Sequence, residues 1–347
     1  MHSKLQVALF SGDRSVSAGT FSGNWTVPDN VTISGAGIGT TVLKNVTGNS
    51  ASVLILNNKS KAMNLTIDGY KSSVPVGASA SGIYVDGKTS FVIEDVEIKN
   101  TNGEGVSIKN SSHYEMRRVY VHHTRAKGDP KDAGGTENSG KVGIQIMGSN
   151  DQFAIVDSCI STHNGMDGLW MAGHHITVTG GSYSYNGQGM TSVGAAGIYT
   201  SESIMNRYIV ITGTTASFNT GLGIDIPLVQ NIAIVGNITE HNNSAGIGVF
   251  EIEGGVIAGN VSKNNCSNEL GQPSWQLAGV VIKDSENVSV SGNLVCDSRA
   301  EKTQEYGINF KGTVADSSIA NNNIYGNKAY NFHFEADYMN VNTIIRE

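Results

Sequence analysis

A short apolar segment that begins with glycine recurs through most of this 347-residue chain, as in Gly82-Ile-Tyr-Val and Gly223-Ile-Asp-Ile. The shortest interval between two such glycines is 23 residues, and the longer intervals indicate insertions into a common unit. Each segment is followed by two further short segments in which apolar and polar residues alternate, which is typical of β-strands. The repeat starts at these glycines: Gly82, Gly105, Gly143, Gly168, Gly197, Gly223, Gly246, Gly279 and Gly307.

Three strands of this length cannot bury their apolar faces within one unit, so each unit must stack on the next. The repeat therefore predicts an all-β fold, a single-stranded parallel β-helix of about eleven coils with three strands per coil. The 43 glycines, 5 prolines and 15% charged residues fit a β-solenoid better than a helical protein. We expect one domain over residues 1–347, with an N-terminal cap at 1–20 and a C-terminal cap at 330–347, because terminal coils would otherwise expose sheet edges.

Composition excludes several classes of partner. The net charge is −7 and the lysines and arginines are scattered, so no nucleic acid is expected to bind. No apolar run is long enough to insert into a membrane. The cysteines are too dispersed for a disulfide framework or a metal site, and we expect them to be buried structural residues. They are Cys159, Cys266 and Cys296.

Asparagine or aspartate recurs at the turn between the second and third strands of each unit. Stacked side chains at this position can bond one another and the backbone along a solenoid, so a structural ladder is expected. The residues concerned are Asp95, Asp157, Asn237, Asn260, Asn293 and Asn322.

Two segments resemble a known superfamily. They are Trp25-Thr-Val-Pro-Asp-Asn-Val-Thr-Ile-Ser-Gly-Ala-Gly-Ile-Gly-Thr-Thr-Val-Leu-Lys44 and His163-Asn-Gly-Met-Asp-Gly-Leu-Trp170. Both are similar to right-handed parallel β-helices of the pectate lyase, polygalacturonase, mannuronan epimerase and phage tailspike type. The resemblance implies a right-handed helix that binds a polysaccharide along the sheet of first strands. It also implies an extracellular location or one at a cell or virion surface, although the first residues contain no signal peptide.

The chain departs from the specific activity motifs of that superfamily. Leu222-Gly-Ile-Asp225-Ile-Pro227 keeps the Gly and Asp of the epimerase motif but lacks its Tyr and His, and the polygalacturonase signatures are absent. Because fold alone does not decide activity, the function must come from the residues that face the predicted groove. The oligomeric state stays open, and a homotrimer is expected only if the protein resembles the tailspikes.

Alternation within the first strands indicates which side chains face outward. The outward row contains Tyr84, Gln145, Trp170, Tyr199 and Asp225. Aromatic rings on a solvent face are suited to stacking on sugars, and covering a loop or an oligomer contact is the alternative. The predicted substrate-binding residues are Tyr84, Glu104, Gln145, Trp170, Tyr199, Arg125 and His175.

Carboxylates occur on the same predicted surface. Asp167 and Asp225 lie two coils apart, roughly 10 Å along the axis at the usual strand spacing. Inverting glycosidases hold their carboxyl groups about 6.5–9.5 Å apart. We therefore predict Asp167 and Asp225 as acid and base, with Glu202 in reserve; a chance pair of surface carboxylates is the alternative.

Histidines and one insertion complete the candidate site. His174 and His175 follow the Trp170 strand, where His174 could act as a base or proton donor. Adjacent strand residues point to opposite faces, so this pair predicts no metal site. The insertion between Thr124 and Val142 carries Arg125 and borders the aromatic coils, as binding loops often do.

The preferred function is a glycoside hydrolase that cuts within a polysaccharide and needs no cofactor. A lyase or C5-epimerase acting on a uronate polymer is the second hypothesis. Such an enzyme would use His174 or a tyrosine as base. A calcium ion is expected only if the protein is a lyase. A non-catalytic adhesin or tail fibre is the third.

Overall fold

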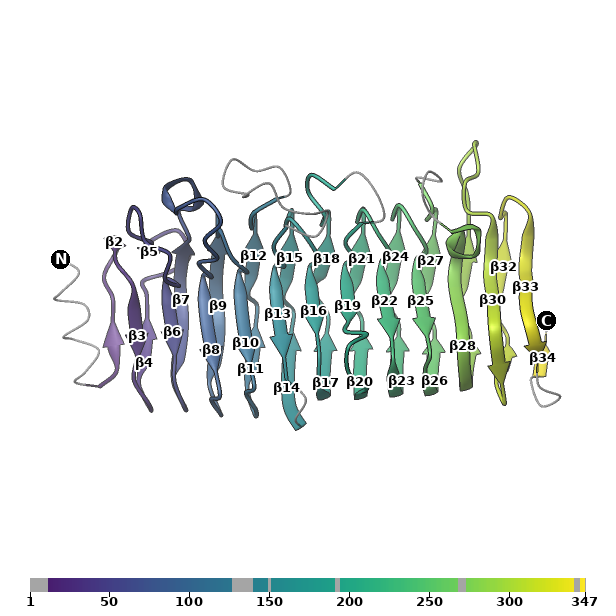
Figure 1. The fold of residues 1–347 in the computed structure, drawn as a ribbon, viewed down its shortest axis with the longest axis horizontal. Helices are drawn as coiled ribbons and strands as arrows, with labels where there is room; N and C mark the ends of the chain where they lie inside the picture. Colours follow the sequence, from purple (N-terminus) through teal and green to yellow (C-terminus); the bar gives the residue numbers. More distant parts are fainter. Residues whose placement is uncertain are drawn as a thin grey trace. The chain divides into compact units, whose positions relative to one another are not determined.

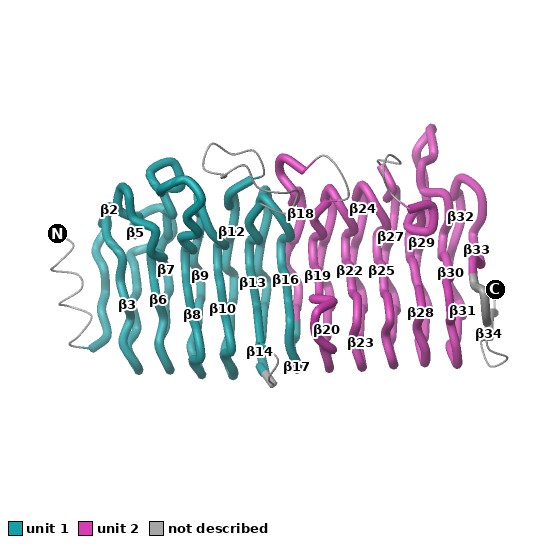
Figure 2. Tube along the Cα trace, in the orientation of Figure 1, with its two compact units in different colours: residues 1–177 teal, residues 178–347 magenta. Residues whose placement is uncertain are grey.

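The computed structural model describes residues 12–126, 140–148, 151–190, 194–267, 273–339 and 344–346. The chain forms two compact units, residues 1–177 and 178–347 (Figure 2). Helix within the described ranges is limited to two single turns of 3₁₀ helix, η1 (Lys71–Ser73) and η2 (Ser274–Gln276). No described helix has the length and apolar character that a membrane span requires.

In the first unit the strands form three parallel sheets, and consecutive coils lie side by side (Figure 1). Sheet 1 contains β3 (Trp25–Val27), β6 (Leu54–Leu56), β8 (Ile83–Asp86), β10 (Val106–Lys109), β13 (Ile144–Met147) and β16 (Leu169–Met171). Sheet 2 contains β1 (Arg14–Ser15), β4 (Thr32–Ser34), the first halves of β7 (Lys61–Asp68) and β9 (Val92–Lys99), β11 (Glu115–Arg117), β14 (Asp151–Asp157) and β17 (His174–Thr179). Sheet 3 contains β2 (Gly19–Ser22), β5 (Thr41–Lys44), the second halves of β7 and β9, β12 (Tyr120–His122) and β15 (Ile160–Thr162).

The second unit repeats this arrangement. Its sheet 1 contains β19 (Ile198–Thr200), β22 (Ile224–Pro227), β25 (Ile247–Phe250) and the first parts of β28 (Ala278–Ser291), β30 (Tyr306–Ala315) and β33 (Tyr330–Met339). Sheet 2 contains β20 (Asn206–Thr212), β23 (Val229–Val235), β26 (Glu253–Ala258), the second part of β28, β31 (Ser318–Ala320) and β34 (Ile344–Arg346). Sheet 3 contains β18 (Ser182–Ser184), β21 (Thr215–Ser217), β24 (Ile238–Glu240), β27 (Val261–Lys263), β29 (Leu294–Cys296) and β32 (Asn323–Tyr325).

The register of sheet 1 confirms the inward residues predicted from the alternation. Ile83, Val106, Ile144 and Leu169 pair across β8, β10, β13 and β16, and all are buried. The second unit has an equivalent row in Ile198, Ile224, Ile247, Val280 and Ile308. Branched side chains stacked on identical positions of successive coils fill the interior of each unit. The predicted all-β parallel solenoid with three strands per coil is confirmed.

The asparagine ladder exists in the second unit. The side-chain amides of Asn237, Asn260 and Asn293 each donate to the Oδ1 of the next member, ending at Asn322, at 3.0, 2.9 and 2.8 Å. Asp95 is not part of such a ladder, because its Oδ1 accepts a hydrogen bond from the Arg118 Nε at 2.7 Å. A carboxylate has no donor to pass on, so aspartate cannot continue a chain of amide bonds.

A second ladder at the turn after sheet 3 was not predicted. The side-chain amides of Asn186, Asn219 and Asn242 each donate to the next Oδ1, ending at Asn265, at 3.1, 3.0 and 3.0 Å. Gln304 continues this ladder, since its Oε1 accepts from the Asn265 backbone N–H at 3.1 Å. The two ladders satisfy backbone groups at turns that sheet hydrogen bonds do not reach.

The three cysteines are buried, as predicted, and form no disulfide among the described residues. Burial raises the pKa of the Cys159 thiol to about 12. The predicted caps are described in part: residues 1–11 lie outside the described ranges, and the segment 330–347 contains β33 and β34. The coil count and the single-domain boundaries stay predictions.

Candidate functional site

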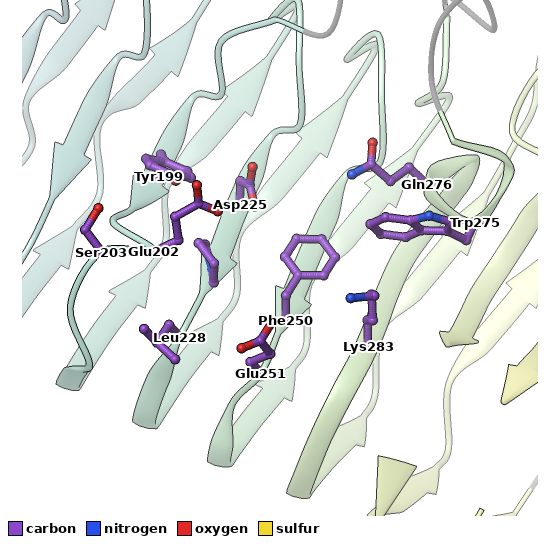
Figure 3. Close-up of a pocket in the computed structure, with 11 residues that line it drawn as sticks. Tyr199, Glu202, Ser203, Asp225, Leu228, Phe250, Glu251, Trp275, Gln276 and Lys283 are labelled. Atoms are coloured by element: carbon purple, nitrogen blue, oxygen red, sulfur yellow. The ribbon is translucent and has the colours of Figure 1, made fainter. Parts of the chain in front are cut away.

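A cavity of about 650 Å³ lies over the outer face of sheet 1 in the second unit (Figure 3). Successive coils contribute to it through β19, β22, β25 and β28, and the η2 turn borders it. The residues that line it are Tyr199, Glu202, Ser203, Asp225, Pro227, Leu228, Phe250, Glu251, Trp275, Gln276 and Lys283. Three of the predicted site residues, Tyr199, Glu202 and Asp225, therefore meet in one cavity.

Asp225 and Tyr199 belong to one outward row. They pair in register on β22 and β19, between inward residues that are fully buried. Both side chains are half-buried and both border the cavity. The strand alternation thus predicts their orientation correctly, and the close spacing of parallel strands brings an aromatic ring beside a carboxylate.

Glu202 reaches the cavity from a local insertion. Tyr199 pairs with Asp225, and Asn206 pairs with Val229. The chain advances seven residues between these two pairs on the Glu202 coil but four on the next coil. The Glu202 coil therefore has an insertion of three residues. The buried Asn206 amide holds this insertion by donating to the carbonyls of Ser201, Ile204 and Leu228 at 2.8, 3.1 and 3.3 Å. Figure 3 shows the Glu202 carboxylate directed towards Asp225.

Phe250 and Trp275 form the apolar side of the cavity. Their ring centroids are 5.6 Å apart and the rings meet edge to face at 78°. Phe250 lies between Asp225 and Trp275 in Figure 3. Aromatic rings offer sugars an apolar surface for stacking. On this unit the sequence predicts such a surface at Tyr199 alone.

The cavity has an excess of acidic groups. Glu202, Asp225 and Glu251 line it together with a single lysine, Lys283. The Lys283 Nζ is 2.9 Å from the Asp284 Oδ2 and 5.7 Å from the centroid of the Trp275 ring. Its charge is therefore already shared with another carboxylate, and the cavity favours uncharged or cationic ligands.

The remaining predicted residues lie in the first unit. Tyr84, Gln145 and Trp170 fall on one row of sheet 1 with Ser107, as the alternation predicts. The Tyr84 hydroxyl donates to Asp86 at 3.1 Å, and burial together with this bond raises its pKa. The Ser107 hydroxyl donates to the Gln145 Oε1 at 3.3 Å.

Other candidates in the first unit have structural partners. The Glu104 carboxylate is 3.2 Å from the Lys141 Nζ. The Arg125 side chain donates to the Ala78 carbonyl at 3.1 Å, and residues 127–139 of its insertion lie outside the described residues. Asp167 is only 4% exposed. The separation of Asp167 and Asp225, which belong to different units, stays a prediction.

The histidine pair begins β17. The His175 ring stacks on Phe153, with centroids 4.7 Å apart and planes at 13°, so one face of the imidazole is covered. Neither His174 nor His175 lines the second-unit cavity. Within the described ranges, no group of three or more His, Cys, Asp or Glu side chains is placed to hold a metal ion.

Sequence reasoning did not assign Phe250 or Lys283 to the site. It placed Glu251 among the carboxylates of the first-strand surface and expected the insertion with Trp275 to close the far end, but gave neither residue a role. Glu251 follows β25, where the backbone leaves the regular alternation with a positive φ of 53°. Lys283 lies within β28, directly before a register shift between Lys283 and Ser285. Trp275 belongs to an insertion whose path the repeat does not specify. Gly248 was the available signal, because a glycine in an outward position leaves room for a neighbouring ring.

No protein-family model and no curated protein sequence matches the chain. Solved structures do match. The A-module of the Azotobacter vinelandii mannuronan C-5 epimerase AlgE4 is 16% identical, with a TM-score of 0.72 over 99% of this chain and 93% of that one. These matches are right-handed parallel β-helices. The chain has that fold.

Two further β-helix proteins give the same result. PfbA, a surface adhesin of Streptococcus pneumoniae, is 11% identical, with a TM-score of 0.68 over 97% of this chain and 88% of that one. The Dettilon tailspike protein is 14% identical, with a TM-score of 0.64 over 93% of this chain and 61% of that one. At such identities the likeness establishes the fold, and the activity has to be argued from the site.

Proposed function

We propose that this β-helix is a glycoside hydrolase that binds an uncharged polysaccharide in the second-unit cavity. The observation that carries the proposal is the convergence of Glu202, Asp225 and Glu251 with the rings of Tyr199, Phe250 and Trp275. The epimerase module named above is described as acting on mannuronan, which supports a polysaccharide ligand. The similarity to tailspikes and an adhesin supports a location at a cell or virion surface.

Glu202 and Asp225 are the proposed catalytic pair. They lie on neighbouring coils, about 4.8 Å apart along the axis before side-chain reach is added, which is compatible with glycosidase carboxyl spacing. One carboxylic acid protonates the glycosidic oxygen as the C–O bond breaks, and the other carboxylate removes a proton from the attacking water. We replace Asp167 by Glu202 in this pair because Asp167 is 4% exposed.

The acidic cavity supports an uncharged substrate. A uronate would place its carboxylate among Glu202, Asp225 and Glu251, with Lys283 already paired to Asp284. Like charges held a few ångströms apart in a partly enclosed site repel strongly. Glucans, mannans, galactans and xylans lack this penalty.

A uronate lyase or epimerase is the second candidate, favoured by one observation. Lys283 and Tyr199 line the same cavity, so a cation and a phenol are both available to a bound uronate. In that reaction Lys283 would leave Asp284 to pair with the sugar carboxylate, and Tyr199 would exchange the C5 proton. The products distinguish the reactions: hydrolysis creates a reducing end, elimination creates an unsaturated sugar that absorbs in the ultraviolet, and epimerisation changes neither.

The test is a panel of linear polysaccharides that includes glucan, mannan, galactan, xylan and polyuronate, with reducing ends and ultraviolet absorbance both measured. Asp225→Asn and Glu202→Gln should lower hydrolysis by about 100-fold or more while glycan binding is retained. Glu240→Gln, a change on sheet 3 of the same unit, is the matched control. Wild-type turnover in the two site variants would contradict the catalytic pair, and glycan binding without any turnover would favour the adhesin reading.

A further inference from the structure

Sheet 1 of the second unit is covered beyond β25. Tyr199 and Asp225 are half-buried, whereas Val281 and Asn309, which continue the same row on β28 and β30, are both 0% exposed. An open groove would leave outward side chains accessible along its whole length. The outward row therefore passes from an accessible surface to a closed one within this unit.

The η2 turn produces this closure. The Asn309 side-chain amide donates to the Trp275 carbonyl at 2.9 Å, which fixes the turn to β30. Trp275, Phe250 and Tyr306 pack against a cluster of buried apolar residues. The buried members of this cluster are Leu222, Ala245, Ala278 and Val281. Trp275 is thus seated on a packed apolar layer.

Two further contacts hold the turn on its other side. The Ser244 hydroxyl donates to the Gln276 Oε1 at 3.3 Å. The Gln276 backbone N–H donates to the Pro273 carbonyl at 2.9 Å, closing the turn on itself. A segment tied to β30 and to the turn before β25, and packed on apolar side chains, has few ways to move aside for a ligand.

We propose that Trp275 is the end wall of the binding groove and that the protein recognises the terminus of a glycan chain. The inference rests on the proposed glycan-binding cavity and specifies which part of the polymer enters it. A sugar chain lying along Tyr199 and Asp225 meets the Trp275 and Phe250 rings and cannot continue over Val281 and Asn309. Cleavage then releases short products from the chain end, which differs from the internal cutting expected from the sequence.

The test uses the same polysaccharide panel, together with oligosaccharides of the glycan that binds. One set is left unmodified, a second has a bulky fluorophore at the reducing end, and a third has a bulky group at the non-reducing end. Binding is measured by titration calorimetry and products by size separation at low conversion. We expect one of the two blocked sets to bind roughly 10-fold or more weakly than the unmodified set, and the products to be short and uniform from the first time points.

Trp275→Ala removes the wall, and Trp275→Phe keeps an aromatic ring there as the matched control. In Trp275→Ala, the blocked set should recover affinity to within about 3-fold of the unmodified one, and products should become mixed in size. Asn309→Ala leaves the Trp275 ring intact but removes the hydrogen bond to the Trp275 carbonyl. It should reduce the difference in affinity between the blocked and unmodified sets, but by less than Trp275→Ala does. Thermal unfolding of each variant shows whether the fold is retained.

The outcomes separate this proposal from the proposed function. Equal binding of all three sets by the wild type, or mixed product sizes at the start, overturns the end wall even if hydrolysis occurs. Terminus selection without turnover supports the end wall and overturns the hydrolase. Failure of every glycan in the panel to bind overturns both, and unchanged selection in a folded Trp275→Ala variant overturns the role of Trp275.

Discussion

A Cβ atom placed on Gly248 would lie 2.5 Å from the ring of Phe250. The same atom would also lie 2.5 Å from a methyl carbon of Leu222, so the outer face of β25 has no room for a side chain at this point. The missing side chain lets Phe250 fold over the sheet, between Asp225 and Trp275. The shape of the cavity therefore depends on a residue that does not itself line it.

Gly248→Ala should displace the Phe250 ring and weaken glycan binding by about 10-fold or more, since real Cβ atoms do not tolerate such contacts. Affinity for the bound oligosaccharide, measured by calorimetry, checks this. In a Phe250→Ala background the same change should cost little further affinity, because the displaced ring is already absent. Additive losses in the double variant would show that Gly248 acts independently of Phe250.

Asn206→Ala should loosen the insertion that carries Glu202. The Ser201 and Ile204 carbonyls lose this donor, whereas the Leu228 carbonyl keeps the Asn206 backbone N–H at 3.0 Å. We therefore expect a loss of stability of about 1–3 kcal/mol and a fall in kcat. Asn219→Ala is the control, because Asn219 is equally buried in a ladder away from the cavity. It should lose similar stability by chemical denaturation while kcat stays near the wild-type value; equal losses of kcat would assign both effects to instability.

Asn260 should be among the residues least tolerant of substitution. Its amide donates to Asn293 and to the Ile234 carbonyl, and its Oδ1 accepts from Asn237. Asn260→Ala leaves buried polar partners unsatisfied and should cost roughly 2–4 kcal/mol in the free energy of unfolding. Ser289→Ala, on the outer face of sheet 2, should change it by less than about 0.5 kcal/mol. A loss at Asn260 as small as that at Ser289 would contradict a stabilising ladder.

Protonation of Asp297 should lower the stability of the second unit at low pH. Burial alone raises its pKa, but hydrogen bonds from Arg299 and the Gln304 backbone outweigh burial and lower the pKa to about 2. The ordinary value is 3.8, so the ionised form stabilises the fold by about 2 kcal/mol above pH 4, and this contribution is lost as the pH falls towards 2.

Denaturant unfolding of the wild type and of Asp297→Asn at pH 7, 4, 3 and 2 measures this contribution. The stability difference between the two proteins should be largest at pH 7 and should shrink steadily below pH 4. A difference that stayed constant across this range would mean that the carboxylate charge contributes nothing and that only the shape of the side chain matters.

Local periodicity allowed much of the architecture to be predicted. Ile224 and Ile247 were assigned to the interior, and Tyr199 and Asp225 to the outer face, because alternate residues of a strand point to opposite sides whatever the rest of the chain does. Repetition with a nearly constant unit then required stacking, since a single coil cannot bury its own apolar face. These inferences need only neighbours in sequence.

Which outward residues are accessible depends on contacts that the repeat does not specify. Val281 and Asp225 occupy equivalent outward positions, yet Val281 is buried because Trp275, from an insertion, packs above it. Glu202 enters the cavity because Asn206 shapes a three-residue insertion. Insertions depart from the repeat, and their paths depend on contacts between side chains distant in sequence. Periodicity therefore predicted the solenoid and its faces, whereas these long-range contacts position the cavity and the apolar cover over Val281.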